Sequence, residues 1–502
     1  MRLASLAAIG VFLAFPAAYP QDHSHAADAT HGLGTVHFAT SCNNAVTPQF
    51  DRGVALLHSF EFAASIKTFN EVLAVDSTCS MAYWGIALSR WTNPMAPGIK
   101  PMTALQQGQQ AVDAATRVGA HATERERGYV SAVGELYRDF DHVDQKTRVL
   151  NYARAMEKLS AQLPADTEAK IFYAISLTAS APPADKTFAN QLKAGKILED
   201  LWAKKPNHPG IAHYIIHTYD FPPLANKAKA AAERYSKIAP LAAHALHMPS
   251  HTFTRLGLWQ SSVDANKQSI DAAMATGSIA EVLHASDYAM YGDLQMAKYQ
   301  DAKAILDGLP ALSARFDPKA VTGAAPGSAG VFALAAIPAR WALERGAWSE
   351  AAALEPKPSD YPYAEAMTYL ARAIGASRVG DQQTARSAVD SLTAIQQRLV
   401  EKGEPYWAEQ VAIQQLDAQA WLYFAQQKSE DAVATLKEAV KREDATEKSA
   451  VTPGPLAPAR EQLADMLMLL HKPAEARAEY RATLLKEPNR RRSLLEAGKA
   501  KK

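Results

Sequence analysis

Histidines are the residues of this sequence whose type and spacing are best suited to chemistry. Seven of the fifteen histidines fall in one stretch, residues 208–287. Five of them form two sets with helical spacing, namely His213 with His217, and His244 with His247 and His251. Residues three or four apart lie on one face of an α-helix, so each set forms a short stripe of imidazoles. The helices that carry these stripes must position them for any joint function.

Imidazole nitrogens in such numbers indicate a transition-metal site, and zinc and copper are the ions that they suit best. Neighbouring helices pack about 8–10 Å apart, which allows two stripes to converge on one ion. The sequence predicts His213, His217, His244, His247 and His251 as metal ligands, with His284 and Asp287 as additional ones. Asp220 is a second carboxylate that can complete the site or orient an imidazole. Two alternatives stay open: histidines that line a solvated groove, and a patch that responds to pH.

No reaction follows from these spacings, so whether the protein is an enzyme stays open. The pair His213 and His217 lacks the glutamate that follows the first histidine in zinc proteases. The sequence contains no glycine-rich phosphate loop, no nucleophile elbow and no haem-attachment motif. Pro249 stands between His247 and His251 and predicts a break in the helix there.

Helices with short breaks account for nearly everything after Pro48, and strand signals are almost absent. Small residues, large apolar residues and a turn proline recur at a spacing typical of helix–turn–helix repeats. The windows include Ala464, Leu467, Ala476, Tyr480, Thr483 and Pro488, and Ala194, Leu198, Leu201 and Pro206. The turns at Gly257-Leu258-Trp259 and Gly346-Ala347-Trp348 fit the junction between the two helices of a repeat. One such unit cannot bury its apolar face alone, so the units are expected to stack.

This pattern resembles the tetratricopeptide repeat (TPR) proteins over most of residues 48–490. The strings LHSFEF, CSMAYWGIALS, HALHMPSH and VTPGPLAPARE are similar to those of an exported bacterial TPR group. The resemblance implies an all-α, right-handed superhelix of antiparallel helix pairs, with a concave groove that binds a protein or peptide. We expect the groove to include Tyr214, Tyr219, Tyr288, Trp84 and Trp91, although aromatic residues at helical spacing are also typical of a core.

The chain divides into five segments. Residues 1–22 contain an apolar run, Leu3 to Phe15, and read as a signal peptide, which predicts a periplasmic or extracellular protein. The alternative is a membrane anchor, for which the run is short, and no later stretch is long and apolar enough to span a bilayer. The remaining segments are a flexible N-terminal segment (23–47), an N-terminal array (48–316), a linker or mobile loop (317–330) and a C-terminal array (331–502).

Charge and cysteine content limit the partners and the compartment. Lys plus Arg total 53 and Asp plus Glu total 52, a balance that argues against a dedicated nucleic-acid binder. The two cysteines, Cys42 and Cys79, suggest one disulfide in an exported protein, which would stabilise the fold by roughly 3–4 kcal/mol. Two buried free thiols are the alternative.

Overall fold

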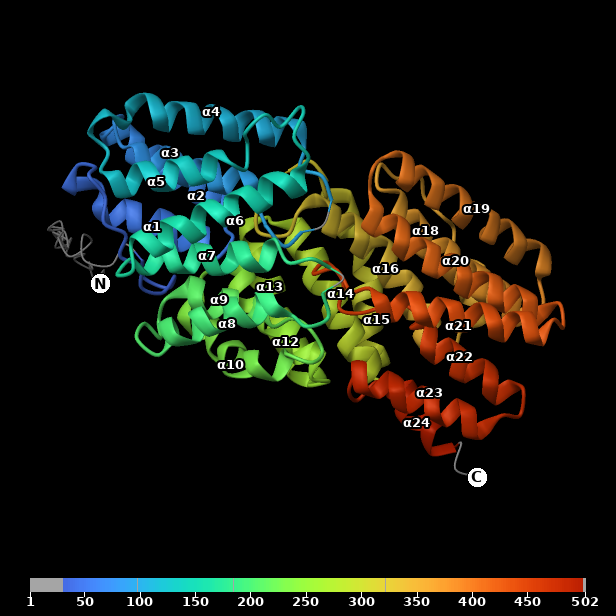
Figure 1. Cartoon of the computed structure of the whole chain (residues 1–502). Helices are drawn as coiled ribbons and strands as arrows, with labels where there is room; N and C mark the ends of the chain where they lie inside the picture. Colours follow the sequence, from blue (N-terminus) through green and yellow to red (C-terminus); the bar gives the residue numbers. More distant parts are fainter. Residues whose placement is uncertain (1–29, 97, 184, 321, 500–502) are drawn as a thin grey trace, which may run out of the picture.

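The structure is a computed structural model that describes residues 30–96, 98–183, 185–320 and 322–499 (Figure 1). Every regular element within these residues is a helix, and none of them forms a β-strand. This confirms the predicted all-α class. The predicted signal peptide, residues 1–22, lies outside the described residues. No helix of the described part is long and apolar enough to span a bilayer.

Short connections link the helices, which follow one another in antiparallel pairs. The first part of the chain contains α1 (Thr47–His58), α2 (Phe62–Val75), α3 (Ser80–Trp91), α4 (Met102–Val118), α5 (Glu124–Gly134), α6 (Gln145–Gln162), α7 (Thr167–Ala179), α8 (Ala189–Trp202), α9 (Pro209–Thr218), α10 (Lys229–Ile238), α11 (Ala243–His247), α12 (Pro249–Arg255) and α13 (Trp259–Thr276). It continues with α14 (Ile279–Gln295), α15 (Tyr299–Arg315), α16 (Gly327–Arg345), α17 (Trp348–Ala352), α18 (Pro362–Val379), α19 (Gln382–Glu401), α20 (Pro405–Ala425), α21 (Ser429–Ala445), α22 (Ala459–Leu469), α23 (Pro473–Lys486) and α24 (Arg491–Lys499). Three short 3₁₀ turns lie at Asn44–Val46, Gly119–His121 and Ala225–Ala228.

Small residues allow the first helices to approach closely. The ring of Phe69 on α2 packs against Gly53 of α1 and Gly85 of α3, where an added Cβ would lie 2.8 Å and 2.2 Å from the ring. Ser65 of α2 donates a hydrogen bond to the Gly53 carbonyl at 2.9 Å. The alternation of small and large residues that identifies the repeats is therefore also what packs them.

The two glycine–tryptophan turns lie where the repeat pattern predicts them. Gly257 separates α12 from α13, and Gly346 ends α16 just before α17. Both glycines have positive φ angles, +66° in each case, which residues with a side chain rarely adopt. A Cβ at Gly257 would also collide with the carbonyl of Pro488, because the C-terminal segment crosses this turn.

Helix α14 lies between two hydrophobic cores. One core is built mainly from residues 33–248 and the other mainly from residues 325–480. All side chains of α14 are buried, and the helix packs against α13 on one side and α16 on the other. Figure 1 shows α14 between the blue-to-green lobe and the orange-to-red lobe. Any group on α14 is therefore held by both parts of the chain.

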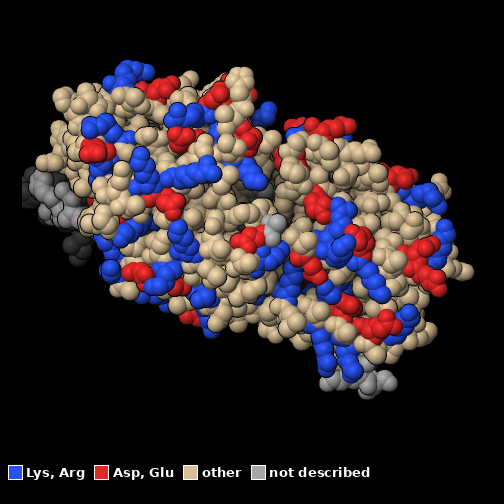
Figure 2. All heavy atoms as spheres, viewed as in Figure 1, with Lys and Arg blue, Asp and Glu red and all other residues tan. Residues whose placement is uncertain are grey.

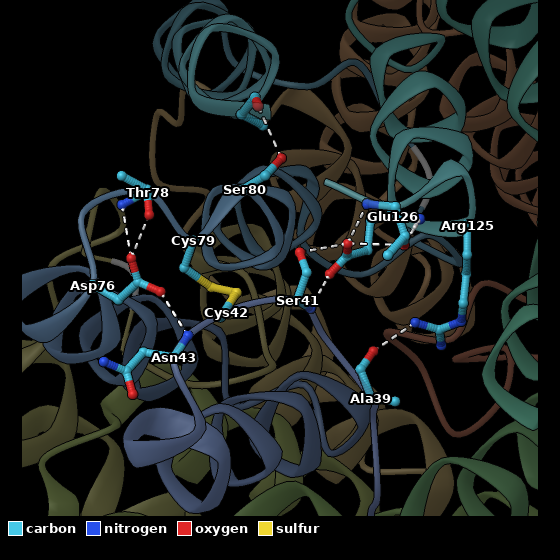
Figure 3. Close-up of a disulfide and its surroundings, with 12 residues drawn as sticks. Ala39, Ser41, Cys42, Asn43, Asp76, Thr78, Cys79, Ser80, Arg125 and Glu126 are labelled. Carbon is cyan, nitrogen blue, oxygen red and sulfur yellow. Dashed lines mark hydrogen bonds between the residues drawn. A yellow bond between two sulfur atoms is a disulfide. The ribbon is translucent and has the colours of Figure 1, made fainter. Parts of the chain in front are cut away.

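Residues 33–46 pack first beside Asn207, whose carbonyl accepts the N–H of Thr35 at 2.9 Å, and then on the first helices, which differs from the flexible segment expected for 23–47. The side chains of Leu33, Val36 and Phe38 are each 2% exposed, so apolar burial fixes the segment. Cys42 forms the expected disulfide with Cys79, at a sulfur–sulfur distance of 2.04 Å (Figure 3). Next to the disulfide, Ser41 donates its backbone N–H and its hydroxyl to the Glu126 carboxylate.

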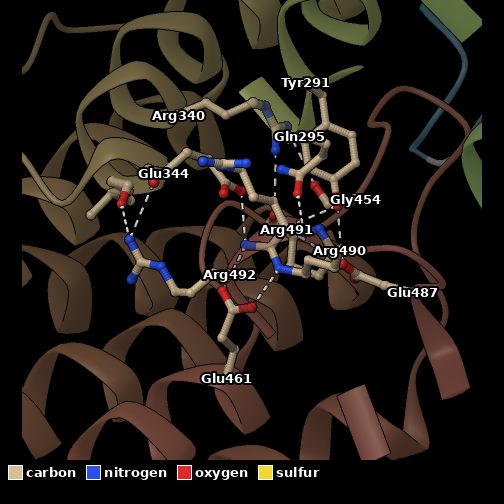
Figure 4. Close-up of polar contacts among 12 residues, drawn as sticks. Tyr291, Gln295, Arg340, Glu344, Gly454, Glu461, Glu487, Arg490, Arg491 and Arg492 are labelled. Atoms are coloured by element: carbon tan, nitrogen blue, oxygen red, sulfur yellow. Dashed lines mark hydrogen bonds and ion pairs between the residues drawn. The ribbon is translucent and has the colours of Figure 1, made fainter. Parts of the chain in front are cut away.

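The C-terminal segment returns to the middle of the chain through a buried arginine. Arg490 is 1% exposed and pairs with Glu461 at 2.9 Å and Glu344 at 2.8 Å (Figure 4). It also donates to the hydroxyl of Tyr291 on α14 at 2.9 Å. A buried arginine needs this many partners, because an unpaired charge in a protein interior is strongly unfavourable. The last helices are thereby fastened to α14 and α16.

The surface mixes both signs of charge. In Figure 2, lysine and arginine side chains are interspersed with aspartate and glutamate over the visible face. This agrees with the balance of 53 basic and 52 acidic residues. The exclusion of nucleic acid as a partner stays a prediction.

Candidate metal centre

Six histidines meet in the core in two groups of three. The first group is His213 and His217 from α9 with His244 from α11, and the second is His247 of α11, His251 of α12 and His284 of α14. One ring nitrogen from each histidine lies within 4.8 Å of those of the other two in its group. The helical spacing on α9 and the break at Pro249 are as the sequence predicted.

The first group presents three ring nitrogens that have no partner in the protein. The Nε2 atoms of His213, His217 and His244 are buried and accept or donate no hydrogen bond. The three residues are 0%, 5% and 4% exposed. A buried polar atom without a partner costs roughly 1–3 kcal/mol, so three together need an explanation.

Contacts behind the rings fix the tautomers of two of these histidines. Nδ1 of His213 donates to the backbone carbonyl of His58 at 2.6 Å, and Nδ1 of His244 donates to the Glu281 carboxylate at 3.2 Å. With the proton on Nδ1, a neutral imidazole carries a lone pair on Nε2. This is the arrangement in which metal-binding histidines are commonly held, with a carbonyl or carboxylate on the far nitrogen.

An aromatic ring covers the first group. Phe60, in the turn between α1 and α2, has its ring centroid 4.4 Å from that of His213 and 5.6 Å from that of His244. Its backbone adopts a φ of +58°, which is unusual for a residue with a bulky side chain. The turn thus places an apolar surface where water would otherwise reach the imidazoles.

The second group contains two lone pairs that face each other. Nδ1 of His247 donates to Asn266 Oδ1 at 2.7 Å, and Nδ1 of His251 donates to Asp220 at 3.0 Å. The Asn266 oxygen is the acceptor, because its amide nitrogen donates to the Ser262 carbonyl at 2.7 Å. Both Nε2 atoms then carry lone pairs, yet they lie 3.0 Å apart. A proton or a cation between them removes this repulsion.

Burial opposes the proton. It lowers the pKa of His251 to about 4 and that of His284 to about 3, because a charged imidazole loses its hydration. Burial and the neighbouring imidazoles also hold the pKa values of His213, His217 and His247 well below the usual value. These five imidazoles are neutral near pH 7, which is the form that binds metal ions.

Three loops from distant parts of the chain close over the histidines. They enclose a cavity of about 20 Å³ lined by His217, His244, His251, His284, Asn93, Ala96, Ala324, Ala325, Pro326, Ala329, Ala450 and Val451. The loops are the α3–α4, α15–α16 and α21–α22 connections. The second of them contains the segment expected to be a linker or mobile loop, 317–330, whose residues 324–325 are buried and whose end, from Gly327, already belongs to α16.

Carboxylates of the site also hold two of these loops. Glu281 accepts the backbone N–H of Ala325 at 2.8 Å through the oxygen that does not face His244. Lys448 donates to Asp220 at 3.2 Å, and Tyr288 donates to the carbonyls of Ala450 and Thr452. Orientation of the imidazoles and closure of the cavity therefore depend on the same side chains.

Several predicted site residues lie elsewhere. Asp287 pairs with Arg340 at 3.0 Å, both fully buried, and belongs to neither histidine group. Its carboxylate is committed to this ion pair, so it is not a metal ligand in this arrangement. The aromatic residues expected in an open groove, Trp84, Trp91, Tyr214, Tyr219 and Tyr288, are at most 4% exposed. Their rings fill the helix interfaces, because burial of aromatic area stabilises the stacked repeats.

A further histidine cluster is held by hydrogen bonds. The Glu168 carboxylate accepts from Nε2 of His58 and Nε2 of His208, each at 2.9 Å. The other nitrogen of His58 accepts from the Tyr214 hydroxyl at 3.1 Å. The charge of Glu168 is balanced by donors on both sides, which lowers its pKa strongly. This cluster borders the first group, because the carbonyl of His58 accepts from Nδ1 of His213.

Sequence reasoning missed four of the groups that complete the site. Glu168 and Asn266 lie outside the recognised strings, and Phe60 and Glu61 lie within LHSFEF but were not singled out. Glu61 accepts backbone N–H groups at the start of α11. The available signal was a polar residue at a position where the helical period demands an apolar one. Asn266 and Glu168 both satisfy it, since each is buried on its helix.

Comparisons with known proteins identify no family for this chain. No protein-family model matches the sequence. No curated protein matches it either. Among solved structures it is similar to a chain of the APC/C hetero-tetramer Cut9–Hcn1 at 13% identity, covering 91% of this chain and 76% of that chain with a TM-score of 0.38.

Two further solved structures have comparable sequence identities and TM-scores. Yeast Tom70 has 10% identity, with 90% of this chain and 88% of that chain covered and a TM-score of 0.34. The human IFIT1 dimer with m7Gppp-AAAA has 11% identity, 89% and 94% coverage and a TM-score of 0.37. At these values the likenesses carry no argument. The succession of helix pairs by itself makes this chain a TPR-like α-solenoid, as its repeats predict.

Proposed function

We propose that the protein binds two transition-metal ions, zinc or copper, one in each group of three histidines. The observation that carries the proposal is the convergence of three buried, unpartnered Nε2 atoms in the first group. A metal ion accepts all three lone pairs and so removes three unfavourable terms at once. In the second group, the opposed nitrogens of His247 and His251 support the same conclusion.

The geometry of the groups suits such ions. Metal–nitrogen distances of about 2.0–2.1 Å place two ligand nitrogens at most about 4.2 Å apart. The ligand atoms lie within 4.8 Å of one another, so small rotations of the rings suffice. Three protein ligands leave one coordination position free, which is typical of sites that act on a small ligand rather than purely structural ones.

The test is the metal content of protein purified without a histidine tag. We expect about two ions per chain by mass spectrometry. His217→Gln and His284→Gln each remove one ligand from a different group, so each variant should retain about one ion. His142→Gln is the control, because His142 is exposed and lies outside every histidine cluster of the core, and it should retain both.

Circular dichroism and thermal unfolding of each variant establish that a lost ion is not a lost fold. Wild-type protein that stays below a tenth of an ion per chain, even after reloading with zinc and with copper, would contradict the proposal. Equal loss from His142→Gln and His217→Gln would contradict it as well, because the effect would then not be specific to the groups.

We also propose, from the TPR-like architecture alone, that the protein binds a protein or peptide segment. The predicted groove residues do not support this, since they are buried. Export to the periplasm or beyond the cell stays a prediction from residues 1–22. The two functions separate experimentally: partner binding should survive His217→Gln, whereas metal binding to the first group should not.

A further inference from the structure

The two groups of histidines are close enough to act as one centre. Ring centroids of His217 and His251, which belong to different groups, are 6.1 Å apart, and those of His244 and His247 are 5.9 Å apart. Distances within the groups range from 4.5 Å to 6.3 Å. The six rings therefore form a continuous cluster, and two ions in it would be neighbours, as in two-metal sites with separations of about 3.5–4 Å.

We propose that this cluster is a dinuclear copper centre whose ligand is dioxygen, bound in the cavity between the two ions. The inference rests on the proposed metal binding and adds the identity of the metal and the class of ligand.

Charge favours copper over zinc. Both groups consist of histidines alone, so among the described residues no carboxylate joins them as a ligand. Asp220 is already paired with Arg255 at 2.8 Å and with Lys448 at 3.2 Å, which leaves Glu281 as the uncompensated carboxylate on a ligand imidazole. Two zinc ions would bring four positive charges into this buried site and two copper(I) ions only two. Fewer buried charges are less unfavourable, and imidazole is a good ligand for copper.

The cavity limits the ligand to a very small molecule. Its volume of about 20 Å³ exceeds the roughly 10–15 Å³ that one water molecule needs and is far too small for an organic substrate. Histidines from both groups line it, so a molecule inside contacts both ions. Apart from Asn93, the rest of the lining is alanine, proline and valine, which offers an incoming molecule little polar contact beyond the two ions. A small, uncharged, apolar molecule such as dioxygen fits this lining, and an organic substrate does not.

The proposed step needs no reactant besides copper(I) and dioxygen. Each copper(I) ion gives up one electron, and dioxygen takes up the two electrons and becomes peroxide held between two copper(II) ions. No proton moves and no bond to the protein forms or breaks. Release of dioxygen is the reverse. Copper is a recognised carrier of such dioxygen chemistry in proteins.

The experiment loads the full-length mature protein with copper(I) under anaerobic conditions and then admits dioxygen. Copper content, measured first, tests the proposed metal binding separately. We then expect uptake of about one dioxygen per two coppers, a new near-ultraviolet absorption band, and no copper(II) paramagnetic resonance signal, because the two ions are coupled. His217→Gln and His284→Gln should hold about one copper and take up no dioxygen in this way.

A variant that fills the cavity tests whether dioxygen binds there. Ala329 of α16 is 1% exposed and lines the cavity without being a ligand. Ala329→Val should keep about two coppers and reduce dioxygen uptake at least tenfold, while His142→Gln, at an exposed histidine outside the core, should match the wild type. Two bound coppers with no uptake in the wild type would overturn the dioxygen inference and leave metal binding intact. Protein that binds zinc but not copper would overturn the inference too. Undiminished dioxygen uptake in Ala329→Val would show that dioxygen does not bind in this cavity.

Discussion

Asp293, on the helix that carries His284, should be a source of instability at neutral pH. Its side chain is fully buried, and neither carboxylate oxygen has a hydrogen-bond partner. Burial raises its pKa from 3.8 to about 6, with smaller effects from Lys267, Asp301, Lys298 and Asp264. Replacing it with asparagine keeps the shape of the side chain and removes the charge.

The sign follows from the direction of the pKa change. A carboxyl group with a raised pKa binds its proton more tightly in the folded state, so stability falls as pH rises from 3.8 to 6. Each pKa unit corresponds to about 1.4 kcal/mol, which gives a penalty of about 3 kcal/mol at pH 8 and about 1.6 kcal/mol at pH 5. Asp293→Asn should therefore stabilise the protein, and by about twice as much at pH 8 as at pH 5.

Urea denaturation followed by far-ultraviolet circular dichroism measures this difference. Wild type and Asp293→Asn are compared at both pH values in one buffer system. Asp271→Asn is the matched control, because Asp271 is exposed on the neighbouring helix α13 and should change stability by less than about 0.5 kcal/mol. A stabilisation that is equal at the two pH values, or a variant less stable than wild type at pH 8, would refute the reasoning.

Three other perturbations have defined outcomes. Glu281→Gln should weaken metal affinity by about 10–100-fold in a chelator competition, because the carboxylate orients a ligand imidazole; unchanged affinity would show that this contact is dispensable. Gly210→Ala places a Cβ 2.4 Å from Nδ1 of His58 and should lower stability by about 1–3 kcal/mol in thermal unfolding, an expectation that an unshifted midpoint would contradict. Cys79→Ser should lose about 4 kcal/mol for a loop of 37 residues, and reduced wild type should behave like the variant if the disulfide is the cause.

Local signals predicted the helices and the first-neighbour geometry of the histidines. Helical spacing placed His213 and His217 on one face of α9, and Pro249 predicted the break between α11 and α12. The turn at Gly257 was predicted from the sequence Gly257-Leu258-Trp259. These features depend only on residues within one or two helical turns of each other, so they can be predicted from a single sequence.

Long-range pairing could not be read in the same way. Asp287 was predicted as a ligand because it lies one turn from His284, yet it forms an ion pair with Arg340 of another helix. The residues taken as groove lining are buried because the stacked repeats leave their faces no access to solvent. Segment 317–330 had the composition of a linker, but the Glu281 carboxylate fixes Ala325 over the site. Each difference comes from a partner more than 40 residues away or from stacking of the repeats.

The wall of the cavity has a consequence for the order of assembly during synthesis. All six histidines have been synthesised once residue 284 has been added, whereas Ala450 and Val451, which complete the enclosure, are added more than 160 residues later. A growing chain can thus offer folded imidazoles to an incoming ion before the last loop is present to shut it in. In the finished chain an ion must pass this last loop, so a protein truncated before Ala450 should exchange metal with its surroundings faster than the full-length chain.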